Sequence, residues 1–367
     1  MSGSARIEAR LARLREAMRS AGVGLTAIAP TDNLRWLLGF APLYDERACA
    51  LLVSAEHAVM LMPSLNAEQT AAHAPGIELV RWADEDGPRS ALRETLARAG
   101  SVGGGTLAAD PEMRADHLLL LQEALAGTRT VDAGGVVWPL REIKDQDELA
   151  LLARSAEVAD RAVEAAWAAC AAGVSELTVA EAINGVFAAA GCEPEFAIVG
   201  AGPNGAFPHH ETGGRLLTEG DAVVIDLGAV LDGYHSDITR MAFIGDPTDR
   251  YREVHAAVEA AVVAATRATR PGATCGEVDA AARDVIDAAG FGEFFVHRTG
   301  HGLGLSGHEP PYVMAGSDVV LRAGMVHSIE PGIYLPDEFG VRLEEIVHVT
   351  DDGCERFSAL GRDVHIA

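Results

Sequence analysis

Apolar and polar residues alternate in two different ways along the chain, and the change comes near residue 135. Before it, short apolar runs separate segments with a helical period. The apolar runs predict strands at 25–30, 48–54, 57–63, 106–110 and 128–134, and the helical segments are 5–20, 89–99 and 111–126. This order predicts a small α/β domain with a largely buried sheet, residues 1–135.

The second part, residues 136–367, contains a repeated pattern, and Trp138-Pro139 is a natural boundary before it. Long helical patterns at 145–172 and 249–270 each precede a glycine-bounded segment, 173–191 or 272–290, with Val and Ala at matching positions. This pattern indicates an internal duplication, whose halves pack their helices on one side of a shared, curved sheet. Chance similarity between alanine-rich helices is the alternative. A real duplication would make the cleft between the halves the natural place for a site.

Composition narrows the class of protein. The length of 367 residues fits two domains, and 49% of them are hydrophobic. The net charge of −25 argues against a nucleic-acid partner or an anionic membrane surface. The five cysteines are widely spaced, which fits a reducing compartment. The N-terminus has the pattern of an amphipathic surface helix and no apolar run reaches membrane-spanning length, so we expect a soluble, cytoplasmic protein.

Acidic residues interrupt apolar strands of the second part. Asp226 lies in AVVIDLGAV, Asp237 in HSDITRMAFI, Glu330 in GMVHSIEPGIY and Glu344 in GVRLEEIVHV, while His301 stands between glycines in RTGHGLGL. Each alone has an ordinary explanation, such as a hydrogen-bonded aspartate or a loop histidine. Together they are harder to dismiss, because an ionised carboxylate is costly to bury unless it is paired or binds a metal.

The charges of these residues favour a metal site. Two carboxylates about 4 Å apart repel by roughly 4 kcal/mol at an effective dielectric constant near 20. The nearby Arg240 and Arg342 are too few to balance four carboxylates, whereas two divalent ions would supply four positive charges. A neutral histidine among the ligands suits borderline metals such as Mn²⁺, Co²⁺ or Zn²⁺.

The ordered series IDLGA, SDITR, GHGLGL, IEPGIY and VRLEE resembles the metal-ligand signature of the pita-bread metallopeptidases over about residues 140–367. The resemblance implies an α/β (α+β) protein with a creatinase-like N-terminal domain and a pita-bread domain with pseudo-two-fold duplication. It implies two divalent metal ions, Mn²⁺ first and Co²⁺, Zn²⁺ or Fe²⁺ as alternatives. The ligands implied are Asp226, Asp237, His301, Glu330 and Glu344, with Asp237 and Glu344 bridging the ions. Glu344 is chosen because it follows Arg342 by two residues; Glu345 remains an alternative.

Further residues match the catalytic and substrate-handling groups of that family. The resemblance implies that Glu330 is the general base and later the proton donor. Three histidines, His209, His297 and His308, match the substrate-handling set, and His308 and His209 would stabilise developing negative charge. His210 is expected to be a bystander.

Two residues beside the ligands have open roles. Arg342 can orient the carboxylate ligands or hold a substrate carboxylate. His327, in GMVHSIE, occupies a position expected to be apolar, and both a contact behind the ligands and a merely tolerated polar residue remain open.

An N-terminal domain together with a complete ligand set is similar to prolidase and aminopeptidase P, which cut the bond before a proline at position two. The function implied is hydrolysis of an Xaa-Pro bond in a small peptide by a homodimer, with a slight preference for an Xaa-Pro dipeptidase. Aminopeptidase P on longer peptides, a creatinase-like amidinohydrolase and an inactive binding module are the alternatives. Many prolidases carry Pro-Arg shortly after the His-Glu pair, where this chain has HEPPY, residues 308–312. Arg298, Arg215 or an arginine of a partner subunit can replace that arginine.

Overall fold

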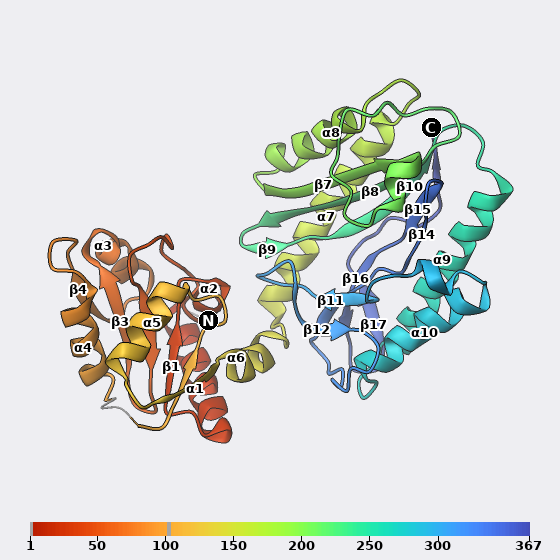
Figure 1. Ribbon diagram of the computed structural model, residues 1–367. Helices are drawn as coiled ribbons and strands as arrows, with labels where there is room; N and C mark the ends of the chain where they lie inside the picture. Colours follow the sequence, from red (N-terminus) through yellow and green to blue (C-terminus); the bar gives the residue numbers. More distant parts are fainter. Residues whose placement is uncertain (1–2, 101–103) are drawn as a thin grey trace. The chain divides into compact units, whose positions relative to one another are not determined.

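A computed structural model describes residues 3–100 and 104–367, and the chain forms two compact units, residues 1–141 and 142–367 (Figure 1). Helix α6 (Gly134–Arg141) spans the expected division at residue 135, and the structure places it in the first unit. Pro139 lies inside this helix, so Trp138-Pro139 does not separate the units. In the described residues, no helix combines the length and the apolar character that crossing a membrane requires.

The described part of the first unit contains a six-stranded sheet in the order β4-β3-β2-β1-β5-β6. Its strands are β1 (Leu25–Ile28), β2 (Ala50–Val53), β3 (Ala58–Pro63), β4 (Glu78–Trp82), β5 (Thr106–Ala109) and β6 (Arg129–Asp132). The helices before α6 are α1 (Gly3–Ala21), α2 (Asp32–Leu38), α3 (Ser64–His73), α4 (Pro88–Arg98) and α5 (Ala115–Ala124). The predicted small α/β domain is confirmed, but β4, α2 and α3 were not predicted. In the edge strand β4, the exposed Glu78 and Arg81 interrupt the apolar run.

The second unit repeats a helix pair. The pairs are α7 (Gln146–Ala169) with α8 (Glu176–Ala189) and α9 (Asp249–Ala268) with α10 (Cys275–Ala288). Gly173 and Gly272 occupy the same place in each pair, and both have a φ of 87°, a left-handed conformation that favours glycine. An isolated bridge pairs Ser175 with Leu216 in the first half, and another pairs Thr274 with Val320 in the second. Equivalent backbone details in both halves support the internal duplication.

The strands of the second unit form separate sheets rather than the one shared sheet that we expected. In the described residues, hydrogen bonds join β18-β10-β8-β7, with β9 on β8, and separately β12-β11-β13-β16-β17, while β14 pairs with β15. The first sheet contains β7 (Glu193–Ala201), β8 (Ala222–Leu231), β9 (Tyr234–His235), β10 (Ile238–Phe243) and β18 (His365–Ile366). The second contains β11 (Gly300–Gly302), β12 (Glu309–Val313), β13 (Val326–Ile329), β16 (Glu345–Val349) and β17 (Cys354–Arg356). The remaining elements are β14 (Gly332–Leu335), β15 (Phe339–Arg342) and the 3-10 helices η1 (Gly202–Ala206) and η2 (Gly292–Phe294).

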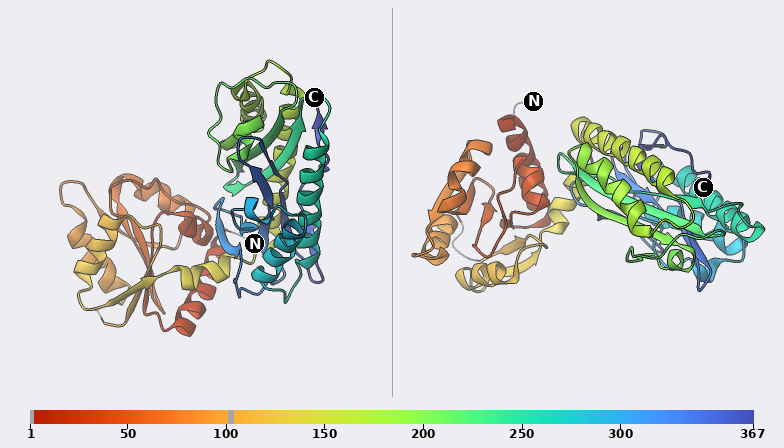
Figure 2. Two further views of the ribbon diagram at one scale, coloured as in Figure 1. Left: turned by 45° about the vertical axis from the view of Figure 1, so that its right-hand side comes forward. Right: turned by 90° about the horizontal axis from the view of Figure 1, so that it is seen from above.

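Two apolar cores lie on opposite faces of β8. Val223, Ile225 and Leu227 pack with the residues of α7 and α8, whereas Ala222 and Val224 belong to the core of α9 and α10. Figures 1 and 2 show α7 and α8 along the green strands of the first half and α9 and α10 beside the blue strands of the second. Because side chains alternate along a strand, the face of β8 that carries Val224 also carries the residue at 226.

Candidate active site

Two aspartates reach the same side of the first sheet. Asp226 follows Val224 by two residues in β8, and its partner in β10 is Thr239. Asp237 precedes Thr239 by two residues, so alternation directs Asp237 and Thr239 to one face. The second half contributes His301 from β11, Glu330 directly after β13, and Glu344 between β15 and β16.

All five expected ligands line one cavity of about 680 Å³ in the second unit. Its wall also contains the apolar residues Phe196, Ile198, Phe207, Pro208 and Val296 and the charged or polar residues His209, His297, Arg298, His308 and Arg342. Sequence analysis did not identify the apolar wall, because such residues are indistinguishable from ordinary core residues without the fold.

His301 shows most clearly that this cavity suits a cation. Asp237, His301 and Glu344 offer ligand atoms that all lie within 4.8 Å of one another. His301 Nδ1 donates a hydrogen bond to the Gly302 carbonyl oxygen at 3.0 Å, which leaves the Nε2 lone pair bare. That lone pair faces Glu330 Oε1 at 3.3 Å and Asp237 Oδ2 at 3.6 Å. Burial, followed by the field of His308, lowers the pKa of His301 to about 3, so the ring is neutral.

Burial and mutual repulsion raise the pKa values of the carboxylates in this cavity. Burial raises the pKa of Asp237 well above its usual value, and the neighbouring Glu344, Asp226 and Glu330 raise it further. Burial likewise raises the pKa of Glu344, and it raises that of Glu330 to about 7. In the described part of the chain, Asp226 Oδ1 and Glu344 Oε1 are buried without a hydrogen-bond partner. Oxygen-rich donors and one neutral imidazole that repel one another fit divalent metal ions.

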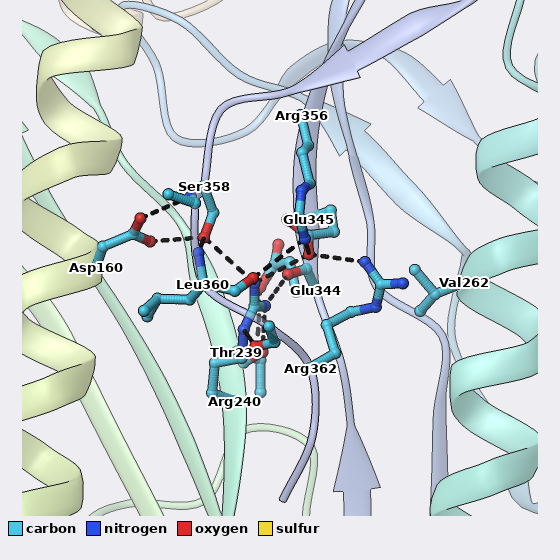
Figure 3. A network of polar contacts seen from close by, with 12 residues as sticks. Asp160, Thr239, Arg240, Val262, Glu344, Glu345, Arg356, Ser358, Leu360 and Arg362 are labelled. Carbon is cyan, nitrogen blue, oxygen red and sulfur yellow. Dashed lines mark hydrogen bonds and ion pairs between the residues drawn. The ribbon is translucent and has the colours of Figure 1, made fainter.

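Glu344 and Glu345 point in opposite directions. Glu344 lines the cavity, and its Oε2 accepts a hydrogen bond from Thr239 Oγ1 at 2.9 Å. Glu345 Oε1 instead accepts from Arg240 and Arg362 at 2.9 Å and from Arg356 at 3.3 Å (Figure 3). Three arginines neutralise Glu345, so the geometry agrees with the choice of Glu344 as the ligand candidate.

A network of polar contacts fixes Glu344 from behind the cavity. The fully buried Arg240 donates through Nη1 to the main-chain oxygen of Glu344 at 2.5 Å and through Nη2 to Glu345, as Figure 3 shows. Thr239 Oγ1 also accepts a hydrogen bond from Arg342 Nε at 3.0 Å. SDITR therefore supplies supporting groups as well as Asp237.

The three expected substrate histidines line the cavity, but they differ in exposure and in hydrogen bonding within the protein. His209 and His308 are exposed, and the His308 ring lies 3.9 Å from that of His301 between centroids. His297 is engaged at both nitrogens: Nδ1 donates to the Arg298 carbonyl oxygen at 2.7 Å, and Nε2 accepts from the Tyr334 hydroxyl at 2.8 Å. The structure therefore favours a supporting role for His297 over direct hydrogen bonding to substrate.

The guanidinium group of Arg342 is also hydrogen-bonded to other residues of the protein. Its Nη2 donates to Asp226 Oδ2 at 2.5 Å, and its Nη1 donates to the Tyr334 hydroxyl at 2.7 Å and to the Pro208 carbonyl oxygen at 3.2 Å. Of the two roles considered for Arg342, these contacts support orientation of a ligand. Tyr334, in the motif EPGIY, links Arg342 to His297 and was not predicted as a site residue.

The two remaining histidines lie outside the cavity wall. His210 Nε2 is 3.0 Å from Glu176 Oε2, which gives this residue a structural partner and agrees with its expected bystander role. His327 is fully buried in β13, with Nδ1 donating to the Ser328 carbonyl oxygen at 2.8 Å and Nε2 unpartnered among the described residues.

Comparison with known proteins places this site in a family. The chain matches the model of Metallopeptidase family M24 over residues 150–351 and that of the Creatinase/Prolidase N-terminal domain over residues 10–143. The chain belongs to metallopeptidase family M24. M24 membership and the matching N-terminal domain confirm the predicted fold class, and the protein is a metal-dependent hydrolase.

M24 proteins of similar length resemble the whole chain. The probable dipeptidase PepE of Mycobacterium tuberculosis is 41% identical over 362 residues, covering 96% of this chain and 95% of that protein. An Xaa-Pro dipeptidase of Lactobacillus delbrueckii is 31% identical, with 97% and 98% covered. The crystal structure of dipeptidase PepE from Mycobacterium ulcerans matches with a TM-score of 0.93, 38% identity and 99% of each chain covered.

Proposed function

We propose that this M24 protein hydrolyses the Xaa-Pro bond of dipeptides with two divalent metal ions bound in the cavity. The observation that carries the proposal is the bare His301 Nε2, which faces two carboxylates beside further acidic ligand candidates. The M24 relatives of similar length are called dipeptidases or Xaa-Pro dipeptidases, which supports the dipeptide and proline preference.

The residues that would hold the metals are Asp226, Asp237, His301, Glu330 and Glu344, with Mn²⁺ as the expected ion. When bound, the ions would neutralise the carboxylates and make both a water molecule and the amide carbonyl more reactive. The hydrogen bonds that fix Asp226 and Glu344 orient these ligands before any metal binds.

Glu330 is the residue that we assign to proton transfer. Its carboxyl lines the cavity with the other ligand candidates, and a carboxylate held beside the reacting bond can act first as general base and then as general acid. Ser328 Oγ, 3.2 Å from Glu330 Oε1, helps to orient the carboxyl group. Glu330 would accept a proton from the attacking water and deliver it to the proline nitrogen, which has no proton of its own in the Xaa-Pro amide.

His308 and His209 would stabilise the negative charge that develops on the carbonyl oxygen. Both line the cavity wall, and partial burial of His308 lowers its pKa, which keeps its ring neutral near pH 7. A neutral imidazole still has one N–H to donate, and one such donor is typically worth about 3 kcal/mol in the transition state. His297, held by Tyr334, would support the wall beside them.

The proposal extends to the assembly and the compartment. A homodimer is the assembly that the family resemblance implies, and analytical ultracentrifugation would test it. A reducing compartment such as the cytoplasm suits the cysteines, which are free, and four of which are buried.

Purified protein with Mn²⁺ should hydrolyse Ala-Pro and leave Ala-Pro-Ala largely intact. Glu330→Gln and His301→Ala should each lower kcat/KM for Ala-Pro by at least about 1000-fold, since each removes a group that acts at the reacting bond. Glu338→Gln, an exposed carboxylate in the β14–β15 turn, is the matched control and should behave as wild type.

Each other outcome has a defined meaning. Activity that persists in both cavity variants would refute the catalytic assignment. Equal cleavage of the tripeptide would favour an aminopeptidase, and hydrolysis of creatine without either peptide would favour an amidinohydrolase. Metal analysis that finds about two ions per chain would support the dinuclear site.

A further inference from the structure

A dipeptide brings a free carboxylate into the cavity. In the proposed function, two divalent ions would balance the four carboxylates that line this cavity and leave no net positive charge for a further anion. The substrate carboxylate follows the proline α-carbon, so it lies about one residue, roughly 3.8 Å, beyond the bond that is cut. Binding of this group therefore needs a cation in the cavity wall that is not already neutralised.

Of the residues that the structure describes, two arginines line the cavity, Arg298 and Arg342. Arg342 is engaged by Asp226, Thr239, Tyr334 and the Pro208 carbonyl oxygen. Further binding to Arg342 would compete with contacts that orient a ligand candidate. The alternative considered from the sequence, Arg215, lies outside the cavity wall and forms a two-bonded ion pair with Asp221 at 2.7 and 3.0 Å.

Arg298 has a different environment. Within residues 3–100 and 104–367, no carboxylate forms an ion pair with it, and the side chain is half-buried. Its guanidinium carbon lies 4.5 Å from the centroid of the Tyr312 ring. Such stacking orients the guanidinium and leaves its in-plane N–H groups available for a carboxylate.

The contact with Tyr312 holds the charge of Arg298 beside the strand pair that carries His301. Tyr312 follows Pro311 in HEPPY, and it pairs with His301 across β11 and β12. The positive charge of Arg298, after the larger effect of burial, also lowers the pKa of His308. The guanidinium is therefore close enough to influence a residue at the reacting end of the cavity.

We propose that Arg298 binds the C-terminal carboxylate of the dipeptide and thereby selects dipeptides over longer peptides. This inference rests on the proposed Xaa-Pro dipeptidase function. Arg298, stacked on Tyr312, supplies this cation from the segment directly before β11. A longer peptide has an amide at this point, which offers no negative charge to the guanidinium.

The test compares Ala-Pro with Ala-prolinamide, which differ in the carboxylate alone. In the wild type, kcat/KM should be about 10- to 100-fold higher for Ala-Pro, the range expected for a charge-assisted hydrogen-bonded contact. In Arg298→Gln this ratio should fall to near one, and in Arg298→Lys it should be intermediate. Arg270→Gln, at an exposed arginine outside the cavity wall, should retain the wild-type ratio.

Product inhibition gives a second measurement. Free proline should inhibit the wild type more strongly than prolinamide, and Arg298→Gln should remove that difference. Should the Gln variant fail to fold, the Lys variant alone tests the ratio, because it keeps the charge but loses the planar two-bonded contact.

The possible failures can be told apart. A wild type that cuts neither Ala-Pro nor Ala-prolinamide contradicts the proposed function itself. A wild type that cuts both equally well shows that no carboxylate is recognised, which overturns the role of Arg298 and leaves the peptidase function intact. An unchanged ratio in both folded Arg298 variants overturns it in the same way.

Discussion

Replacing Lys144 by methionine would remove a cation that pairs with the buried carboxylate of Glu309. Lys144 is the only lysine of the chain, and its Nζ lies 2.6 Å from Glu309 Oε1. Both side chains are 2% exposed, so water cannot replace the lost partner. Glu309 directly follows His308, and the pair therefore ties the start of the second unit to the cavity loop.

The expected loss is large because the pair is buried. Removing one partner of a buried ion pair typically costs about 3–5 kcal/mol. For a unit of this size, each kcal/mol lowers Tm by about 2–4 °C, so Lys144→Met should lower it by roughly 6–20 °C. The double variant Lys144→Met/Glu309→Gln removes both charges and should regain much of the loss, with a coupling energy of about 2–3 kcal/mol.

Scanning calorimetry in the presence of a chelator would measure these shifts, because bound metal would otherwise stabilise the native state. Arg154→Met is the matched control: Arg154 pairs with Asp232 at 3.1 Å on the surface, where such pairs contribute less than about 1 kcal/mol. A Tm for Lys144→Met within 2 °C of the control would refute the reasoning. A double variant no more stable than the single one would show that the ion pair is not the cause.

Two further predictions concern the cavity. Because burial raises the pKa of Glu330 to about 7, the metal-free protein holds protons that metal binding must release; affinity for Mn²⁺ should therefore increase from pH 6 to pH 8. Calorimetric titration in two buffers of different ionisation enthalpy would detect the protons, and a pH-independent affinity would contradict the prediction. Tyr334→Phe removes the hydroxyl between Arg342 and His297 and should lower kcat/KM for Ala-Pro by about 10-fold or more, since it leaves buried polar groups unpaired. Steady-state kinetics would measure it, and wild-type kinetics in a folded variant would show that this link does not support the site.

The sequence predicted secondary structure best where the local apolar pattern is sufficient to identify a strand or a helix. Apolar runs identified β1, β2, β3, β5 and β6, and helical periodicity identified the long helices of both halves. It was weaker for the edge strand β4 and for the short helices α2 and α3. In β4 the exposed Glu78 and Arg81 interrupt the apolar run, and packing against neighbouring elements supplies most of the stability of such segments.

For the site, the resemblance to the family motif chose between two neighbouring glutamates. Glu344 was preferred to Glu345 because it follows Arg342 by two residues, and the three arginines that surround Glu345 agree with that choice. Sequence comparison grouped His297 with the substrate residues, but its hydrogen bonds to Tyr334 and to the Arg298 carbonyl oxygen use both nitrogens. Tyr334 lies 37 residues further along the chain, so no local motif indicates this contact.

By itself the sequence determined which side chains are available: an ordered set of carboxylates and one histidine, set in apolar strands of a duplicated helix–strand pattern. Only the tertiary structure decided which of their charges are already neutralised. Arg342 is committed to Asp226 and Arg240 to Glu345, whereas Arg298 stacks on Tyr312 without an acidic partner among the described residues. The reason is that the free energy of a charge depends on burial and on the groups within a few ångströms, and folding alone sets both.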